Sequence, residues 1–306
     1  MGERQYDLTD ANGVYSNTRT VKHPKPEKSY GKIIGRYAGS TLVYVILIIY
    51  FLLIAYPLFW MVVNSLRDSN DIITNSWGLP DKLLFKNYAT AWESGIARYF
   101  LNSVIVTGIT CLLTILFSAL AAYAFARFQF KGKNALLIFC IGGLMLAPQV
   151  SLIPLYKLMQ SLNLYDTYWA LILPYVAYRI PFILLLIRSY FLGIPREISE
   201  SAYLDGCNNF QIFTKIFLPL SKPVLMTAAV LTGYFAWNEF MFAIVFISND
   251  ELKTVPAGLM QFRDALQTDW GSLLAGLTIS ALPIVLLFLF AQKYFIRGLS
   301  NGGLKG

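Results

Sequence analysis

Long runs of apolar residues, separated by polar stretches, dominate the pattern along this chain of 306 residues. Six runs reach the length of about 20 residues that an α-helix needs to cross the hydrocarbon core of a bilayer. They are Thr41–Val63, Asn102–Phe125, Ala135–Leu158, Tyr168–Phe191, Val224–Ile247 and Ser272–Tyr294. The pattern therefore predicts an all-α membrane protein whose six transmembrane helices form a bundle.

Proline recurs inside these runs and predicts kinked helices. It is tolerated in a membrane helix where neighbouring helices satisfy the freed backbone groups. The prolines are Pro57, Pro148, Pro154, Pro174, Pro181 and Pro283.

Residues 1–40 differ from the rest, because they are polar and are interrupted by Pro24 and Pro26. Near the start we find no short apolar core followed by a small-residue cleavage site, so we expect no cleavable signal peptide. We expect a polar cytosolic tail over 1–40, with Tyr30–Ser40 along the membrane surface, and a six-span domain over 41–306.

Composition and charge agree with this class. The chain is 56% hydrophobic and only 14% charged, against about 25% charged in soluble proteins. The net charge is +8. The basic residues are distributed unevenly, with 17 Lys and Arg residues on one side of the predicted spans and 7 on the other, which indicates how the chain is oriented in the membrane. Positive residues mark the cytosolic side. We therefore expect a multi-pass protein of the cytoplasmic membrane, surrounded by lipid, with both termini cytosolic and no nucleic-acid partner.

The residues needed for covalent or nucleotide chemistry are missing. His23 is the only histidine, and Cys111, Cys140 and Cys207 suggest no disulfide framework. No G-x-x-x-x-G-K-[ST] sequence is present to cradle nucleotide phosphates. We expect no catalytic residue, no metal site and no bound cofactor in this chain.

The polar stretch 196–223 between the fourth and fifth runs carries signals for two short helices. Glu197 lies where an anion favours the first turn, and Gly206 is a suitable left-handed cap. Asn208 followed by Gln211 resembles a capping box at the start of a second helix. The stretch predicts a helix-turn-helix on the cytosolic side.

An aromatic face is expected on the second of these helices. Phe210, Phe213 and Phe217 are three and four residues apart, so they share one side of a helix. If exposed, they form an apolar patch, and such patches mark partner surfaces. A helix-in-groove contact with another protein is the expected use.

This stretch resembles the cytoplasmic coupling loop, or E-A-A loop, of ATP-binding-cassette (ABC) importer permeases, especially the carbohydrate-uptake branch related to the maltose permeases. The residues that carry the resemblance are Glu200, Ala202, Asp205, Gly206, Leu218, Pro219, Leu220 and Pro223. Ser201 replaces the first alanine of the motif. The chain from residue 41 onward is similar to this family, which implies the type I importer permease fold.

The resemblance implies partners as well as a fold. Loop 196–223 would couple to two ABC ATPase subunits that carry ATP and Mg²⁺, with Glu200 and Asp205 either pairing with basic groups there or capping the loop. A second homologous permease would complete the path. The C-terminal tail 295–306 resembles the family's ending. It implies an ATPase contact by Gly302, Gly303 and Lys305, against the alternative of a frayed end.

The outer loops are also similar to those of sugar permeases. In loop 64–101 the sequence W-G-L-P has two interpretations: a binding surface for an external partner, or aromatic residues that anchor helix ends at the membrane interface. In loop 248–271 the resemblance implies an extracytoplasmic solute-binding protein facing Pro256, Gly258, Gln261 and Phe262. A simple surface connection is the alternative for that loop.

Polar residues inside the predicted spans are candidates for a translocation path. Arg179 and Glu239 are the deepest ionisable residues, and a charge at mid-membrane costs at least about 2.5 kcal/mol on insertion scales. They could pair with each other. With Asn238, and with Tyr234 and Trp237 stacking on sugar faces, they suggest a hydrated path. Hydrogen bonding that only holds the bundle is the equally weighted alternative.

The predicted function is a permease subunit of an ATP-driven importer of a sugar or oligosaccharide. It is not an enzyme, because the ATPase is a separate subunit. The alternatives are a secondary transporter, or an ABC permease for a non-sugar solute. A membrane-embedded enzyme is disfavoured, because converging nucleophile, base or metal ligands are lacking.

Overall fold

The structure, a computed structural model, describes residues 30–262 and 269–300, and the side chains of 41–260, 269–290 and 292. The described part is helical throughout, with turns and short loops and no strand. The chain divides into two units, Met1–Pro57 and Leu58–Gly306. The C-terminal candidates Gly302, Gly303 and Lys305 lie outside the described residues.

Helix α1 (Tyr30–Asn64) provides the described part of the first unit and ends in the second. It begins eleven residues before the predicted span at Thr41, so Tyr30–Ser40 continues the helix. The run of apolar residues marked the part that fits a bilayer and not the end of the helix.

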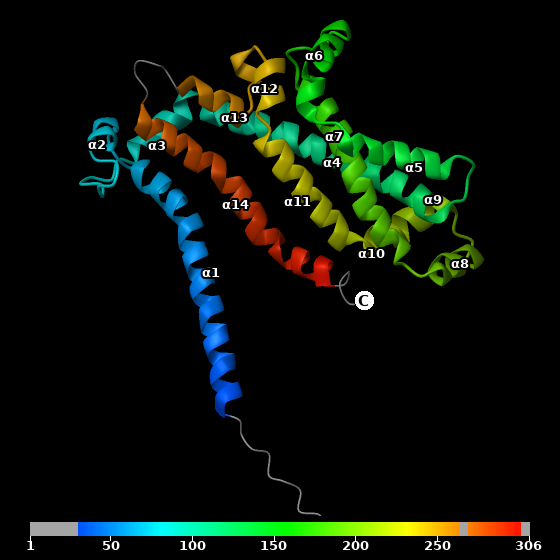
Figure 1. Cartoon of the computed structure of the whole chain (residues 1–306). Coiled ribbons are helices and arrows are strands. Elements are labelled where there is room, and N and C mark those ends of the chain that lie inside the picture. Colours follow the sequence, from blue (N-terminus) through cyan, green and yellow to red (C-terminus); the bar gives the residue numbers. More distant parts are fainter. Residues whose placement is uncertain (1–29, 263–268, 301–306) are drawn as a thin grey trace, which may run out of the picture. The chain divides into compact units, whose positions relative to one another are not determined.

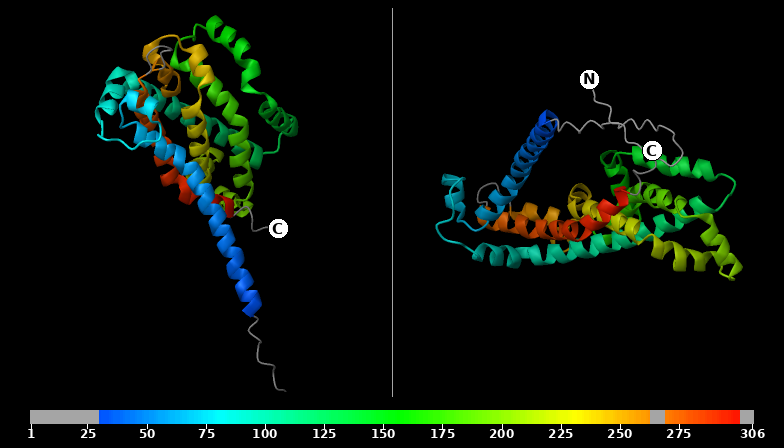
Figure 2. Two further views of the ribbon diagram at one scale, coloured as in Figure 1. Left: turned by 60° about the vertical axis from the view of Figure 1, so that its left-hand side comes forward. Right: turned by 90° about the horizontal axis from the view of Figure 1, so that it is seen from below.

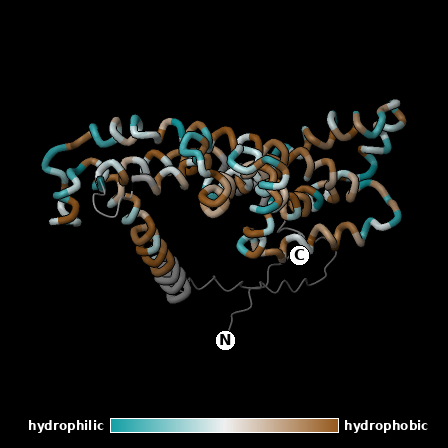
Figure 3. Tube along the Cα trace, turned by 90° about the horizontal axis from the view of Figure 1, so that it is seen from above, coloured by the Kyte–Doolittle hydropathy of each residue, from teal (hydrophilic) through white to brown (hydrophobic). Residues whose placement is uncertain are grey.

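The second unit contains the other helices, which are drawn in Figure 1. They are α2 (Ser69–Thr74), α3 (Lys86–Ala91), α4 (Ala97–Arg127), α5 (Lys133–Gly142), α6 (Leu152–Ser161), α7 (Tyr168–Leu192), α8 (Arg196–Leu204), α9 (Asn209–Ile212), α10 (Leu218–Leu220), α11 (Lys222–Asn238), α12 (Met241–Phe246), α13 (Val255–Gly258) and α14 (Trp270–Ser300). Brown, hydrophobic residues dominate these helices in Figure 3, and teal is most frequent in the turns.

Four described helical stretches are long and apolar enough to cross a membrane, and there are six if two bent pairs each count as one span. The four are Thr41–Asn64, Lys86–Arg127, Tyr168–Leu192 and Trp270–Phe290. The bent pairs are Lys133–Met145 with Pro148–Ser161, at 90°, and Asn209–Leu220 with Lys222–Asn238, at 76°. The all-α membrane fold is thus confirmed.

Two predicted spans are not the continuous helices that the pattern suggested. In the third, Leu146 and Ala147 are extended before Pro148, because proline disfavours a helical conformation in the residue that precedes it. In the fifth, the helix ends at Asn238, and Glu239 is extended before α12 begins. Hydropathy measures apolar length and does not detect such breaks.

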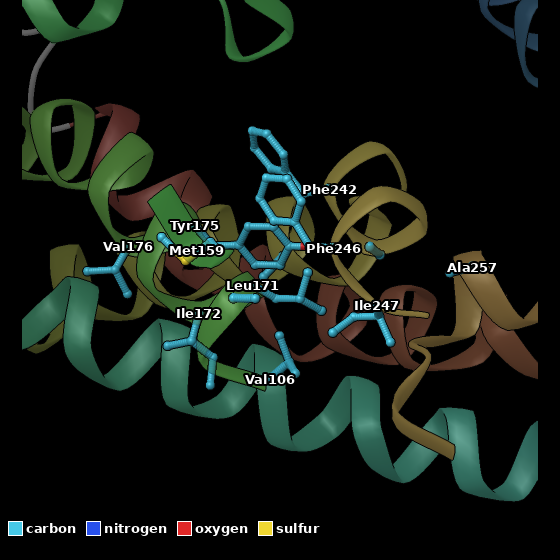
Figure 4. Close-up of a cluster of buried hydrophobic side chains, with 13 residues drawn as sticks. Val106, Met159, Leu171, Ile172, Tyr175, Val176, Phe242, Phe246, Ile247 and Ala257 are labelled. Carbon is cyan, nitrogen blue, oxygen red and sulfur yellow. The ribbon is translucent and has the colours of Figure 1, made fainter. Parts of the chain in front are cut away.

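The long helices α4 and α7 pack along each other, and α11 packs on α4, α7 and α14. Two further views show α14 running beside α11, which itself lies along α4 (Figure 2). A core cluster between α4, α7 and α12 includes Val106, Tyr175, Phe242 and Phe246, all at most 1% exposed (Figure 4). The rings of Phe242 and Phe246 stack at 5.2 Å.

The long helix α4 links two groups of short elements in the second unit. At one end lie α8, α9 and α10, and toward the other end lie α12 and α13 (Figure 1). With 31 residues, α4 is about 46 Å long at the helical rise. The coupling candidates therefore lie at the α8–α10 end and the binding-protein candidates toward the α12–α13 end, whereas the path candidates lie in or just after α7 and α11 between them.

Candidate functional site

The stretch between α7 and α11 is a helix-turn-helix, as the sequence predicts. Helix α8 has Pro195 at its N-cap, and Gly206 turns the chain with φ of +82°. The side chain of Asn208 accepts from the Gln211 backbone N–H at 2.8 Å, while Gln211 accepts from the Asn208 N–H at 2.9 Å. This capping box starts α9 and fixes the second arm.

The aromatic residues of this stretch do not share an exposed face, so that prediction is wrong. Phe217 is 0% exposed and Phe213 is also buried, whereas Phe210 is 68% exposed. Phe217 packs against Tyr123 of α4 and Phe191 of α7, at centroid distances of 4.9 and 5.2 Å. The apolar face anchors the stretch to the bundle, and helical spacing alone could not tell an inward face from an outward one.

Ala202 is also an internal residue. It is 6% exposed and belongs to the same buried cluster as Phe213 and Phe217. It therefore supports the stretch from inside, and its part in coupling to an ATPase stays a prediction. A small side chain at this position lets α8 pack closely on the cluster.

A different set of side chains faces outward around the Gly206 turn. Leu204 is 90% exposed and lies beside Gly206, and Tyr203 is 46% exposed. Together with Phe210 we call them the elbow surface, and we call the helix-turn-helix of residues 196–220 that carries it the elbow, with α8 as its first arm and residues 209–220 as its second. Glu200 and Asp205 are exposed too. Leu204 and Tyr203 were not among the predicted residues, because helical spacing within this short segment does not show which side faces outward.

The loop 248–258 is pinned to the N-terminal end of α4. The Asn102 amide donates to the carbonyls of Glu251 and Lys253 at 2.8 and 2.9 Å. Ser103 Oγ accepts from the Val255 N–H at 2.8 Å, and Arg98 pairs with Glu251 at 2.6 Å. This loop is therefore a defined surface feature.

Two of the four residues predicted to face a binding protein can be placed in detail. Pro256 is half-buried, and Gly258 is buried. A Cβ on Gly258 would lie 2.2 Å from the Tyr99 ring, so Gly258 faces the interior and its predicted partner contact is wrong. Gln261 and Phe262 lie in the short helix Leu259–Phe262, and their side chains are outside the description.

Next to this loop is an open hollow that the sequence did not predict. It has a volume of about 570 Å³ and is lined by Trp92, Glu93, Ser94, Gly95, Ala97, Arg98, Tyr99, Asp250 and Glu251. Its walls come from the π-helical turn Trp92–Ile96 and from loop 248–258. Because the two walls lie about 150 residues apart in sequence, no local motif could reveal the hollow.

The loop 64–101 is ordered by a buried arginine. Arg67 is 5% exposed and donates to Asn64 Oδ1 and to the carbonyls of Asn75 and Asp71. Trp77 is exposed, as either an interfacial anchor or a partner seat would require. The two interpretations therefore stay open for this loop.

Glu239 and Arg179 do not pair with each other, which excludes the suggested ion pair. The Glu239 carboxylate accepts from the Tyr175 hydroxyl at 2.5 Å and from the N–H groups of Phe242 and Ala243. Arg179 donates to the Leu231 carbonyl at 3.3 Å and lies over the Phe235 ring. Glu239 thus satisfies the backbone at the break between α11 and α12, in line with the structural alternative.

The remaining path candidates separate into buried and exposed groups. Trp237 is buried, and its indole donates to the Ser280 carbonyl at 3.0 Å, so it is not free to stack on a sugar. Tyr234 is 57% exposed on an apolar groove of about 380 Å³ between α11 and α14. Asn238 is exposed, and its amide donates to the Tyr234 carbonyl. In the described part, no three His, Cys, Asp or Glu residues are grouped to hold a metal.

Comparison with known proteins identifies the family. The profile for binding-protein-dependent transport system inner membrane components matches residues 114–301. The chain is 61% identical over 270 residues to the probable ABC transporter permease protein YurM of Bacillus subtilis, covering 88% of this chain and 90% of the relative. It is 37% identical over 256 residues to the trehalose/maltose transport system permease protein MalG of Thermococcus litoralis, covering 82% and 91%.

A solved structure shares the fold. One chain of a bacterial ABC transporter that imports the acidic polysaccharide alginate superposes with a TM-score of 0.73 at 21% identity, covering 85% of this chain and 98% of that one. The relatives decide against the secondary-transporter alternative and against an enzyme. The chain belongs to the binding-protein-dependent transport system inner membrane components, the permease subunits of ABC importers.

Proposed function

We propose that this permease imports a sugar or oligosaccharide and that its elbow surface docks on ABC ATPase subunits, which bind the ATP and Mg²⁺. The observation that carries the docking is the exposure of Leu204 and Phe210 on either side of the Gly206 turn. Two large apolar side chains left in water on a short protrusion gain free energy when a groove covers them. Glu200 and Asp205 flank them with negative charge for basic partner groups.

The remaining partners follow from this docking. With the elbow in the cytosol, both termini are cytosolic, and loops 64–101 and 248–271 face outward to a solute-binding protein. The hollow beside Arg98 and Glu251 is our candidate surface for that protein. The apolar groove at Tyr234 is our candidate contact for the second permease, because it lies between two long spans and has apolar walls.

The mechanism we propose is alternating access. ATP binding closes the ATPase dimer, the elbow moves with it, and the spans rearrange to open the path outward. Phe213 and Phe217 anchor the second arm of the elbow in the bundle, so movement of that arm is transmitted to α4 and α7. The chain itself makes and breaks no covalent bond.

Co-purification tests the docking. The double variant Leu204→Asp with Phe210→Asp should leave the chain folded, because both side chains are exposed, but should abolish co-elution with ABC ATPase subunits of the same host. Ile73→Asp in α2 is the matched control, since Ile73 is 65% exposed and far from the elbow in the chain. Unchanged co-elution of the double variant would contradict the proposal.

The sugar assignment rests on the T. litoralis relative, whose name specifies trehalose and maltose. Uptake into proteoliposomes with the cognate binding protein should be competed by gluco-oligosaccharides or other neutral sugars. Competition by amino acids or peptides and not by sugars would favour the non-sugar alternative.

A further inference from the structure

One cation joins the elbow to the bundle. Arg127 is the last residue of α4. Its Nη2 donates to the carbonyl of Phe191 at 3.1 Å and to that of Ile194 at 2.6 Å. These carbonyls lie at and just after the C-terminal end of α7, where the helix dipole is negative and favours a cation. Arg127 therefore ties α4 to the segment that leads directly into α8.

The same guanidinium also holds the second arm of the elbow. Its central carbon lies 4.6 Å from the centroid of the Phe217 ring, a cation–π geometry. Tyr123, one turn earlier on α4, packs on Phe217, and its hydroxyl donates to the Asn209 carbonyl at 3.4 Å. Arg127 and Tyr123 thus contact the chain on both sides of the Gly206 turn.

This arrangement uses properties that are specific to arginine. The guanidinium is planar, so one plane can lie against a ring while its edge donates to two carbonyls. A lysine ammonium is a compact charge on a flexible stem and cannot do both in one geometry. A residue that served only to orient the helix by the positive-inside rule would need the charge alone.

We propose that Arg127 is a positioning residue that transmits movement of the elbow to α4 and α7. The inference rests on the proposed docking of the elbow on an ATPase. Without the guanidinium, the second arm stays attached to α4 through Tyr123, Phe213 and Phe217, but α8 loses its link to the end of α4 and can shift independently of it. ATP is then hydrolysed without a matching movement of the spans.

The test compares Arg127→Met and Arg127→Lys with the native chain in the reconstituted complex of permeases, ATPase and binding protein. The readout is the amount of solute transported per ATP hydrolysed. We expect this ratio to fall about tenfold in Arg127→Met, within the usual range of coupling between sites, and to be partly rescued in Arg127→Lys. Lys131→Met is the matched control, because it removes a nearby positive charge from an exposed side chain.

The outcomes are separable. If both Arg127 variants keep the native ratio, or if Lys131→Met lowers it equally, the inference is wrong. If Arg127→Met fails to assemble, the ratio in Arg127→Lys decides alone, because a purely charge-based role predicts full rescue. If the native chain neither binds the ATPase nor transports with ATP, the proposed function itself is wrong, and the role of Arg127 falls with it; a working native chain with unchanged variants rejects the role of Arg127 alone.

Discussion

At the scale of single residues, the three phenylalanines between α8 and α10 lie in two different environments. Phe210, Phe213 and Phe217 fit one helical face, yet two of them are buried and one is exposed. The deciding contacts come from Tyr123 and Phe191, which are distant in sequence. Local periodicity contains no information about such partners.

The phenylalanines should therefore respond differently to truncation. Phe217→Ala removes a fully buried ring and should lower the free energy of unfolding by about 3–5 kcal/mol. Phe210→Ala should change it by less than about 0.5 kcal/mol, as for most surface positions. Thermal unfolding of the purified chain in detergent measures both, and equal losses would contradict the packing of Phe217.

Gly258 gives a second prediction at this scale. A methyl group there would clash with Tyr99, so Gly258→Ala should destabilise the chain by about 1–3 kcal/mol. Gly108→Ala in α4 is the control, because a Cβ there meets open space and alanine favours helix. The same unfolding experiment should show opposite signs. If Gly258→Ala is as stable as the native chain, loop 248–258 does not pack on Tyr99.

At the scale of elements, the sequence predicted where apolar segments and caps lie, and it missed what interrupts them. The capping box at Asn208 and the turn at Gly206 depend only on neighbouring residues, so they could be predicted from the sequence. The bend before Pro148 could be anticipated only as a kink. The break at Glu239 depends on Tyr175 of another helix, so it could not be anticipated.

Asp269, directly before α14, gives a prediction about how the stability of the chain depends on pH. Burial raises the pKa of Asp269, but hydrogen bonds from Ser272 and Ser69 outweigh it and hold the pKa below the usual 3.8. Because the folded-state pKa is lowered, the stabilisation is present above about pH 4 and is lost as the pH falls through the folded-state value.

The comparison is made between the native chain and Asp269→Asn, by thermal unfolding in detergent at a series of pH values. The native chain should be more stable near neutral pH, and the difference should shrink toward about pH 3. A difference that does not depend on pH would show that the charge of Asp269 is not what holds α2 and α14 together.

At the scale of the whole molecule, hydropathy and basic residues predicted a six-span bundle, and the distribution of charge predicted its orientation. What they could not supply is the role of α4, whose two ends hold loop 248–258 and the elbow through Asn102 and Arg127. That role depends on contacts between segments far apart in the chain. It connects the proposed ATPase side to the proposed outer side through one rigid helix.

The most direct test of the account asks on which side the elbow lies and whether an ATPase covers it. In a chain whose native cysteines are replaced by serine, Leu204→Cys and Ile73→Cys are labelled with a membrane-impermeant thiol reagent. Leu204→Cys should react in inverted vesicles, become protected when ATPase is bound, and stay unlabelled in right-side-out vesicles, where Ile73→Cys reacts instead. Labelling of Leu204→Cys from outside, or equal labelling with and without bound ATPase, would contradict the account.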